Sequence, residues 1–153
     1  MKKENKIFKV DKTEDSIGFL LWQVTNLWQR EIRKALEKYD LTHSQFVLLA
    51  SILSLNKEMD IVTQIRLSNH TKIDPMTVST VLRTLQKKGL VKRKEHASDT
   101  RAKTVDLSPN GEKTVQQALK TVEQFDKSVF ELLGSKSDSF KEKLQAILKK
   151  DME

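Results

Sequence analysis

Residues 65–87 limit the possible folds most, because a short apolar segment is followed within a few residues by a strong helix start. Asp74 and Pro75 are typical of a helix N-terminus, since aspartate caps the first free amides and proline suits the first helical position. Apolar residues then recur with the spacing of one buried helix face, at Val78, Val81, Leu82 and Leu85. The pattern predicts two helices joined by a tight turn.

The outward face of this second helix has an unusual composition. Residues 75–93 contain no acid, and Thr and Ser, which are poor helix formers, stand where Glu is common on solvated helices. Hydroxyl and cationic side chains bond base edges and phosphates in the DNA major groove, which repels carboxylates. We expect DNA contacts from Thr77, Ser79, Thr80, Arg83, Thr84 and Lys87.

Two short strands are predicted next, at residues 90–94 and 103–107, after Gly89 at a position typical of a helix end. A β-hairpin directly after a recognition helix is a wing that reaches along the duplex. Arg101, planar and always charged, suits the narrow minor groove, while Asp99 either orients a basic neighbour or only forms the turn. The wing residues expected to meet DNA are Lys92, Arg93, Lys94, Asp99, Arg101 and Lys103.

The net charge of +7 is concentrated around these elements. Residues 59–107 hold 10 basic and 5 acidic side chains, whereas residues 1–58 hold 10 and 8, and residues 108–153 hold 8 and 8. A local excess of this kind favours a polyanionic partner over an evenly solvated surface. With 4 Gly and 2 Pro in 153 residues, the chain is expected to be one mainly helical domain.

Helices are also predicted on both sides of this region. Residues 15–39 carry an apolar stripe, with Phe19 and Trp22 on the opposite side, to be covered either by a second subunit or by residues 7–10. The helix after Ser108 and Pro109 has an apolar heptad pattern, which favours a dimer but also fits packing within one subunit. The expected dimerisation residues are Phe19, Trp22, Val115, Val122, Phe125 and Val129.

Several classes of function lack a signal in the sequence. There is no cysteine, and His43, His70 and His96 lie apart without the spacing of a zinc site. No phosphate-binding glycine loop or nucleophile motif occurs, so we expect no cofactor, metal or enzymatic activity. Without a long apolar run or a secretory signal, a cytoplasmic protein with no membrane partner is expected.

The motifs together resemble those of the MarR family of dimeric winged helix-turn-helix regulators over residues 15–135. The resemblance rests on Thr77-Val78-Ser79, Leu85, Gly89-Leu90-Val91, Arg93, Asp99-x-Arg101, Val105-x-Leu107-Ser108 and Gly111. It implies an α+β winged-helix lobe at residues 42–107 and a dimerisation lobe from residues 15–39 and 108–153. Thr100 and Ala102 replace arginines common in relatives, and Ser68 replaces a common alanine.

The resemblance also implies a function. Such a protein binds double-stranded DNA at a pseudo-palindromic operator as a homodimer, most often as a repressor. Relatives commonly release DNA when a small amphipathic or phenolic effector binds. The alternative is a winged-helix module that binds protein rather than a specific DNA, although this class has little reason to exclude acids from residues 75–93.

Overall fold

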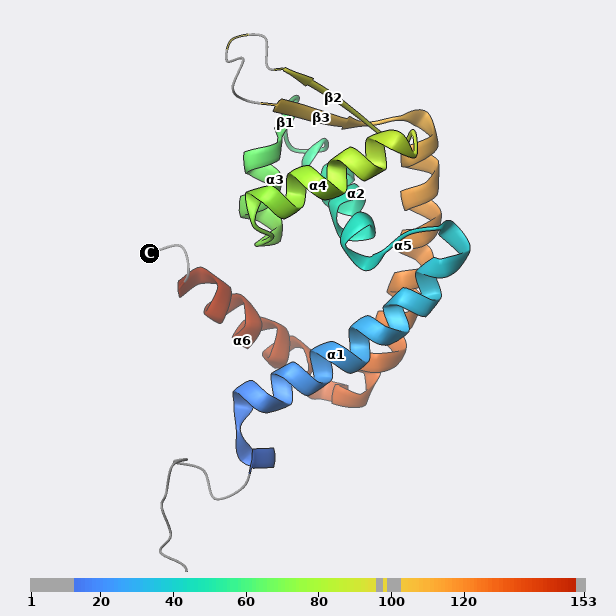
Figure 1. Ribbon diagram of the computed structural model, residues 1–153. Helices are drawn as coiled ribbons and strands as arrows, with labels where there is room; N and C mark the ends of the chain where they lie inside the picture. The colour runs from blue at the N-terminus through green and yellow to red at the C-terminus, as the bar shows by residue number, and fades with distance from the viewer. Residues whose placement is uncertain (1–12, 96–97, 99–102, 151–153) are drawn as a thin grey trace, which may run out of the picture.

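The computed structural model describes residues 13–95, 98 and 103–150, and its architecture is a mainly helical winged helix (Figure 1). The helices are α1 (Ile17–Leu36), α2 (His43–Leu55), α3 (Gln64–Thr71), α4 (Pro75–Lys87), α5 (Pro109–Phe130) and α6 (Ser137–Lys150). The strands are β1 (Val62–Thr63), β2 (Val91–Glu95) and β3 (Lys103–Leu107). Short 3-10 segments cover Thr13–Asp15, Glu37–Tyr39 and Glu131–Lys136. The expected fold class is confirmed.

Side-chain caps define where the helices begin. Thr42 and Gln45 form a reciprocal capping box at α2, with both hydrogen bonds at 3.2 Å. The Thr77 amide donates to Asp74 Oδ1 over 2.9 Å at the start of α4. These bonds satisfy amides that have no partner within the helix, which explains why the starts were predictable from local sequence.

The turn between α3 and α4 is held by a buried hydroxyl. Ser68 is buried in α3, and its Oγ donates to the Ile73 carbonyl over 2.6 Å. An alanine at this position would leave that carbonyl without this partner. Of the four residues predicted for the inner face of α4, Val78, Leu82 and Leu85 are at 0% exposure and Val81 is half-buried against the core. The core therefore fixes which face of α4 points outward.

The wing is a three-stranded antiparallel sheet in the order β1-β3-β2. Its register pairs Arg93 with Val105 and Lys92 with Asp106, so neighbouring residues of β2 face opposite sides of the sheet. Strand β1 was not predicted from the sequence. Two residues are too short to show an alternating pattern, and β1 exists through its pairing of Val62 with Val105.

The end of α4 leads into the wing through a left-handed glycine. Gly89 has φ 70°, its amide bonds the Gln86 carbonyl, and the Leu90 amide bonds the Leu85 carbonyl, each at 3.0 Å. This pair of bonds is the Schellman motif, which closes a helix and turns the chain. The predicted helix end at Gly89 is confirmed.

The first turn of α5 docks on this same segment. The Ser108 amide donates to the Leu90 carbonyl over 3.0 Å, and Ser108 Oγ donates to the Gly89 carbonyl over 2.6 Å while accepting from the Gly111 amide at 2.9 Å. A Cβ atom on Gly111 would lie 1.9 Å from the Leu90 carbonyl oxygen. The two backbones therefore approach more closely than any other residue type allows.

The heptad pattern of α5 proves to be largely a core pattern. Val115 is completely buried and Val122 is 6% exposed, both within the hydrophobic core of this one chain. The expectation that they lie at a subunit contact is therefore wrong, because α5 packs against α1 and α2 along this face. Phe125 is half-buried against the same core, and Val129 is half-buried further along α5.

Polar contacts join α1, α2 and α5 beside this core. Trp28 Nε1 donates to Asp126 Oδ1 over 2.7 Å, and the ring of His43 meets the Trp28 ring edge-on at 5.0 Å. Tyr39 and Thr121 share a hydrogen bond of 2.6 Å between their hydroxyls. Trp28 also packs against the hydrophobic core.

The outer ends of α1 and α6 have little cover within the chain. Only Ile32 and Leu36 of α1 are buried, and α6 has no buried residue. Figure 1 shows α6 leaving the body as an arm beyond the end of α5. Large apolar side chains stay exposed here, at Ile17, Leu20, Leu21, Trp22, Val24, Leu27, Leu132, Phe140, Leu144, Ile147 and Leu148.

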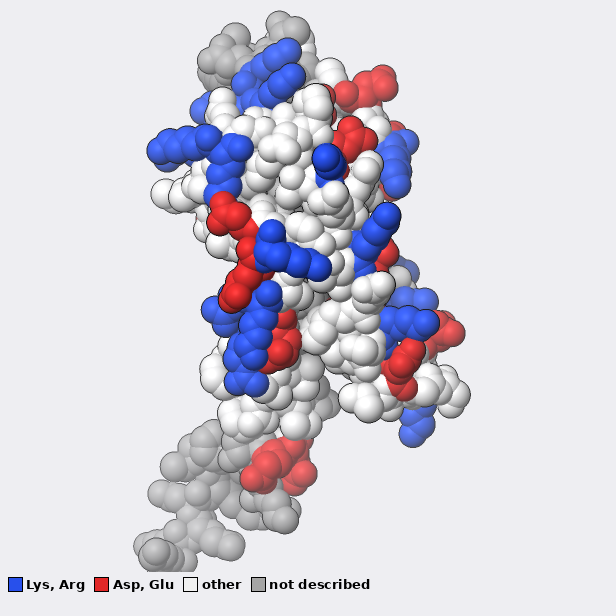
Figure 2. All heavy atoms as spheres, turned by 90° about the vertical axis from the view of Figure 1, so that its right-hand side faces the viewer, with Lys and Arg blue, Asp and Glu red and all other residues white. Residues whose placement is uncertain are grey.

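Phe19 and Trp22 stack at this end with ring centroids 6.2 Å apart, and Trp22 is 64% exposed. Residues 7–10, the alternative cover for them, lie outside the described residues. Figure 2 shows that acidic and basic side chains are interspersed on the face that carries α5. This face therefore does not carry charges of a single sign. None of the described helices has the length and apolarity needed to cross a lipid bilayer.

Gly111→Ala should destabilise the fold by about 2–3 kcal/mol, because the added methyl overlaps the Leu90 carbonyl and forces α5 away from the turn. The matched control is Gly18→Ala in α1, where the nearest atom is Ser16 Oγ at 4.0 Å. Chemical denaturation followed by circular dichroism measures both variants. Equal unfolding free energies for the two variants would contradict the close approach.

Stability should fall as the pH drops below the ordinary imidazole value of 6.5. Burial lowers the pKa of His43, against the opposing charge of Asp126, so the folded chain favours the neutral ring. Protonation therefore favours the unfolded chain, and the stabilisation is complete only above the unfolded pKa. Unfolding free energies measured between about pH 5 and 8 should vary less in His43→Gln than in the wild type.

Candidate nucleic-acid interface

The outward face of α4 presents hydroxyl and cationic side chains to solvent. Thr77, Thr80, Arg83, Thr84 and Lys87 are exposed, and Ser79 is half-buried. All six residues predicted for this face lie on one helix whose opposite side is in the core. The helix is therefore held rigidly from behind while its outer surface stays free of acids over residues 75–93.

Two of these hydroxyls are oriented by the helix itself. Thr80 Oγ1 donates to the Met76 carbonyl over 3.0 Å, and Thr84 Oγ1 donates to the Thr80 carbonyl over 3.3 Å. Such bonds to the carbonyl four residues earlier fix the side-chain rotamer. The oxygen lone pairs of both threonines remain available to a donor from outside.

Met76 belongs to this surface but was not predicted. It is the second residue of α4, and its side chain is 81% exposed. The N-terminal residues of a recognition helix reach base edges, and an apolar side chain there can meet a thymine methyl group. A methionine among threonines carries no charge or hydrogen-bonding signal, and only its exposure in the fold distinguishes it from a core residue.

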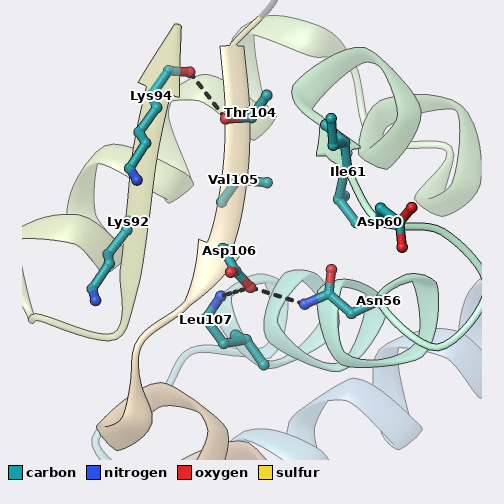
Figure 3. Close-up of a pocket in the computed structure, with 10 residues that line it drawn as sticks. Asn56, Asp60, Ile61, Lys92, Lys94, Thr104, Val105, Asp106 and Leu107 are labelled. Atoms are coloured by element: carbon teal, nitrogen blue, oxygen red, sulfur yellow. Dashed lines mark hydrogen bonds between the residues drawn. The ribbon is translucent and has the colours of Figure 1, made fainter. Parts of the chain in front are cut away.

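The wing has two chemically different faces. On the outer face, Lys92 and Lys94 line a hollow of about 390 Å³ together with Asp60 and Asp106 (Figure 3). Asn56 Nδ2 donates to Asp106 Oδ1 over 2.9 Å across this hollow. Charges of both signs therefore meet on the outer face.

The inner side of the wing forms a cleft of about 340 Å³ with α4 that we call the basic cleft. The described residues that line it are Arg83, Gln86, Arg93, Lys94 and Lys103. Burial lowers the pKa of Arg93, and the nearby charge of Arg83 lowers it further. The structure thus brings recognition-helix and wing cations together, a juxtaposition that the sequence did not reveal.

The remaining predicted wing residues do not belong to the described lining of the basic cleft. Asp99 and Arg101 lie outside the described residues. Lys92 is exposed on the outer face, away from the basic cleft. Within residues 13–95, 98 and 103–150, no three His, Asp or Glu side chains group closely enough to hold a metal ion.

Comparison with known proteins finds winged-helix relatives of this chain. The protein-family model described as "ArnR1-like, winged-helix domain" matches residues 37–125 of this chain. The HTH-type transcriptional regulator YdcH of Bacillus subtilis is 42% identical over 134 residues, which cover 88% of this chain and 90% of the relative. The chain belongs to the MarR family of winged-helix transcriptional regulators. Members of this family are regulators rather than enzymes.

Several solved structures share the fold at lower identity. MepR of S. aureus, crystallised with DNA, has a TM-score of 0.78 and 20% identity, covering 93% of this chain and all of that one (100%). CouR of Rhodococcus jostii RHA1, bound to p-coumaroyl-CoA, has a TM-score of 0.78 and 23% identity, covering 91% and 96%. A mutant of E. coli MarR with operator DNA has a TM-score of 0.73 and 24% identity, covering 89% and 93%.

Proposed function

We propose that this MarR-family chain binds a specific double-stranded DNA sequence through α4 and the wing. The observation that carries the proposal is the exposed face of α4, which is free of acids and adjoins the basic cleft. An α-helix with short polar side chains and arginine fits the major groove and can hydrogen-bond base edges. The cations on the wing then meet the phosphate backbone on the same side of the molecule.

We propose further that the binding species is a homodimer. The uncovered apolar residues of α1 and α6 lie at the end of the molecule remote from the wing (Figure 1). Contiguous exposed apolar surface of this kind marks an interaction site in soluble proteins. A symmetric pair of chains joined there carries two copies of α4, which fits an operator with two related half-sites about one helical turn apart.

The regulator is proposed to act as a repressor that responds to a small amphipathic or phenolic effector. The relative CouR was crystallised with p-coumaroyl-CoA, which supports a ligand of this class. Such a ligand releases DNA only if it binds more tightly to a dimer whose two α4 helices no longer match the operator spacing. The polar junction of Trp28, His43 and Asp126 lies where α1 and α5 meet α2, between the two lobes.

Arg83→Ala should weaken binding to an operator duplex by about tenfold or more, because it removes a recognition-helix cation. The assay is fluorescence anisotropy with duplex DNA from upstream of the protein's own gene, beside a scrambled duplex, at several salt concentrations. Arg101→Ala, at the residue that the sequence predicts for the minor groove, is tested in parallel. Arg30→Ala in α1 is the matched control and should bind as the wild type does.

The outcomes of this assay separate two functions. Selective binding that weakens steeply with salt supports the regulator, because phosphate contacts release counterions. If wild type, Arg83→Ala and Arg101→Ala bind the duplexes with equal affinity that does not depend on salt, the result favours a module that binds protein instead.

Leu21→Glu should convert the dimer to a monomer without unfolding the chain, because Leu21 is 54% exposed and supports no core of its own subunit. Ile65→Glu in α3 is the matched control, since Ile65 is 62% exposed but lies in the DNA-binding lobe. Light scattering coupled to size-exclusion chromatography gives the mass of each variant. A monomeric wild type, or a dimeric Leu21→Glu variant, would refute the proposed contact.

A further inference from the structure

The basic cleft gathers cationic residues from α4 and from both long strands of the wing. Arg83 on α4 and Arg93 on β2 line it together with Lys94, Lys103 and the neutral Gln86. No acid is among its described lining residues. The guanidinium groups of Arg83 and Arg93 carry like charges and repel each other.

Arg93 carries the second observation. Its Nε atom is buried and has no hydrogen-bond partner within the described part of the chain. A buried donor without an acceptor costs free energy, and the cost is greater for a charged group. The inner position of Arg93 follows from the sheet register, because its partner Val105 is 3% exposed and belongs to the core.

We propose that the basic cleft is a binding site for one phosphate group, held between Arg83 and Arg93. A tetrahedral phosphate offers several acceptor oxygens, and the fork of a guanidinium group matches two of them at once. One such group supplies an acceptor to the Arg93 side chain and neutralises the repulsion between the arginines. Lys103, which also lines the cleft, adds a further positive charge.

Two sources provide this chemistry, namely the backbone of bound DNA and a free phosphate-bearing anion. The DNA form of the proposal rests on the DNA-binding function proposed above, whereas the site itself does not. Because both ligands need the same two arginines, a free phosphate anion competes with the duplex. The competition is specific and adds to the general screening by salt.

The outer hollow of the wing provides an internal comparison. It has a similar volume, about 390 Å³, but places Lys92 beside Asp60 and Asp106. The carboxylates compensate the lysine charges and repel an anion. Lys92→Gln removes one positive charge from β2, the strand that carries Arg93, without changing a residue that lines the basic cleft. It is therefore the control for Arg83→Gln.

The test follows the side-chain Nε–H signal of Arg93 by NMR in the nitrogen-15-labelled full chain. The signal is assigned as the one lost in Arg93→Lys. Inorganic phosphate is titrated against sodium chloride at equal ionic strength. We expect phosphate, but not chloride, to shift the signal, with a dissociation constant on the order of millimolar. Arg83→Gln should weaken phosphate binding roughly tenfold, whereas Lys92→Gln should leave it within about twofold of the wild type.

Equal shifts with phosphate and chloride, or equal effects of Arg83→Gln and Lys92→Gln, would overturn the site. A second titration uses the operator duplex selected by anisotropy. A shift with duplex but none with inorganic phosphate supports a site for backbone phosphate only. If phosphate shifts the signal while no duplex is bound selectively, the phosphate site stands and the DNA-binding proposal fails.

Discussion

The contact between Gly111 and the Leu90 carbonyl sets the geometry of the whole molecule. It joins the start of α5 to the turn that ends α4 and begins β2, and Ser108 reinforces it with hydrogen bonds to both Gly89 and Leu90. Helix α5 is thus docked by its first turn on the segment that joins α4 to β2. A rotation of α5 cannot occur without moving the end of α4 or breaking these bonds.

Much of this fold was predictable because its signals are local. The caps at Thr42, Asp74 and Ser108 bond amides within three residues, and Gly89 ends α4 within its own turn. The buried stripe of α4 also follows from the period of a single helix. Features of this kind depend on neighbouring residues and need no knowledge of the tertiary arrangement.

The features that escaped prediction depend on distant partners. The heptad residues Val115 and Val122 have the spacing of a dimer seam, but α1 and α2 of the same chain cover them. The pattern specifies an apolar helix face and does not state which chain buries it. The two-residue strand β1 exists only beside β3.

The candidate site shows the same division. The composition of residues 75–93 indicated the outward face of α4, and the structure places those side chains there. The difference between Lys92 and Arg93 was hidden, because it arises from which side of β2 faces α4. Met76 was missed because methionine is common in cores, and only the fold shows that its side chain is exposed.

Gly134 interrupts the chain between α5 and α6, with φ 52° and ψ −130°. The helix beyond it has 14 residues and no buried side chain. A helix of this length is marginally stable in water by itself, so its order depends on what covers its apolar face. If a second chain supplies that cover, the helical content of the C-terminal arm rises with protein concentration, and the amount of regulator in the cell governs how completely its last helix is folded.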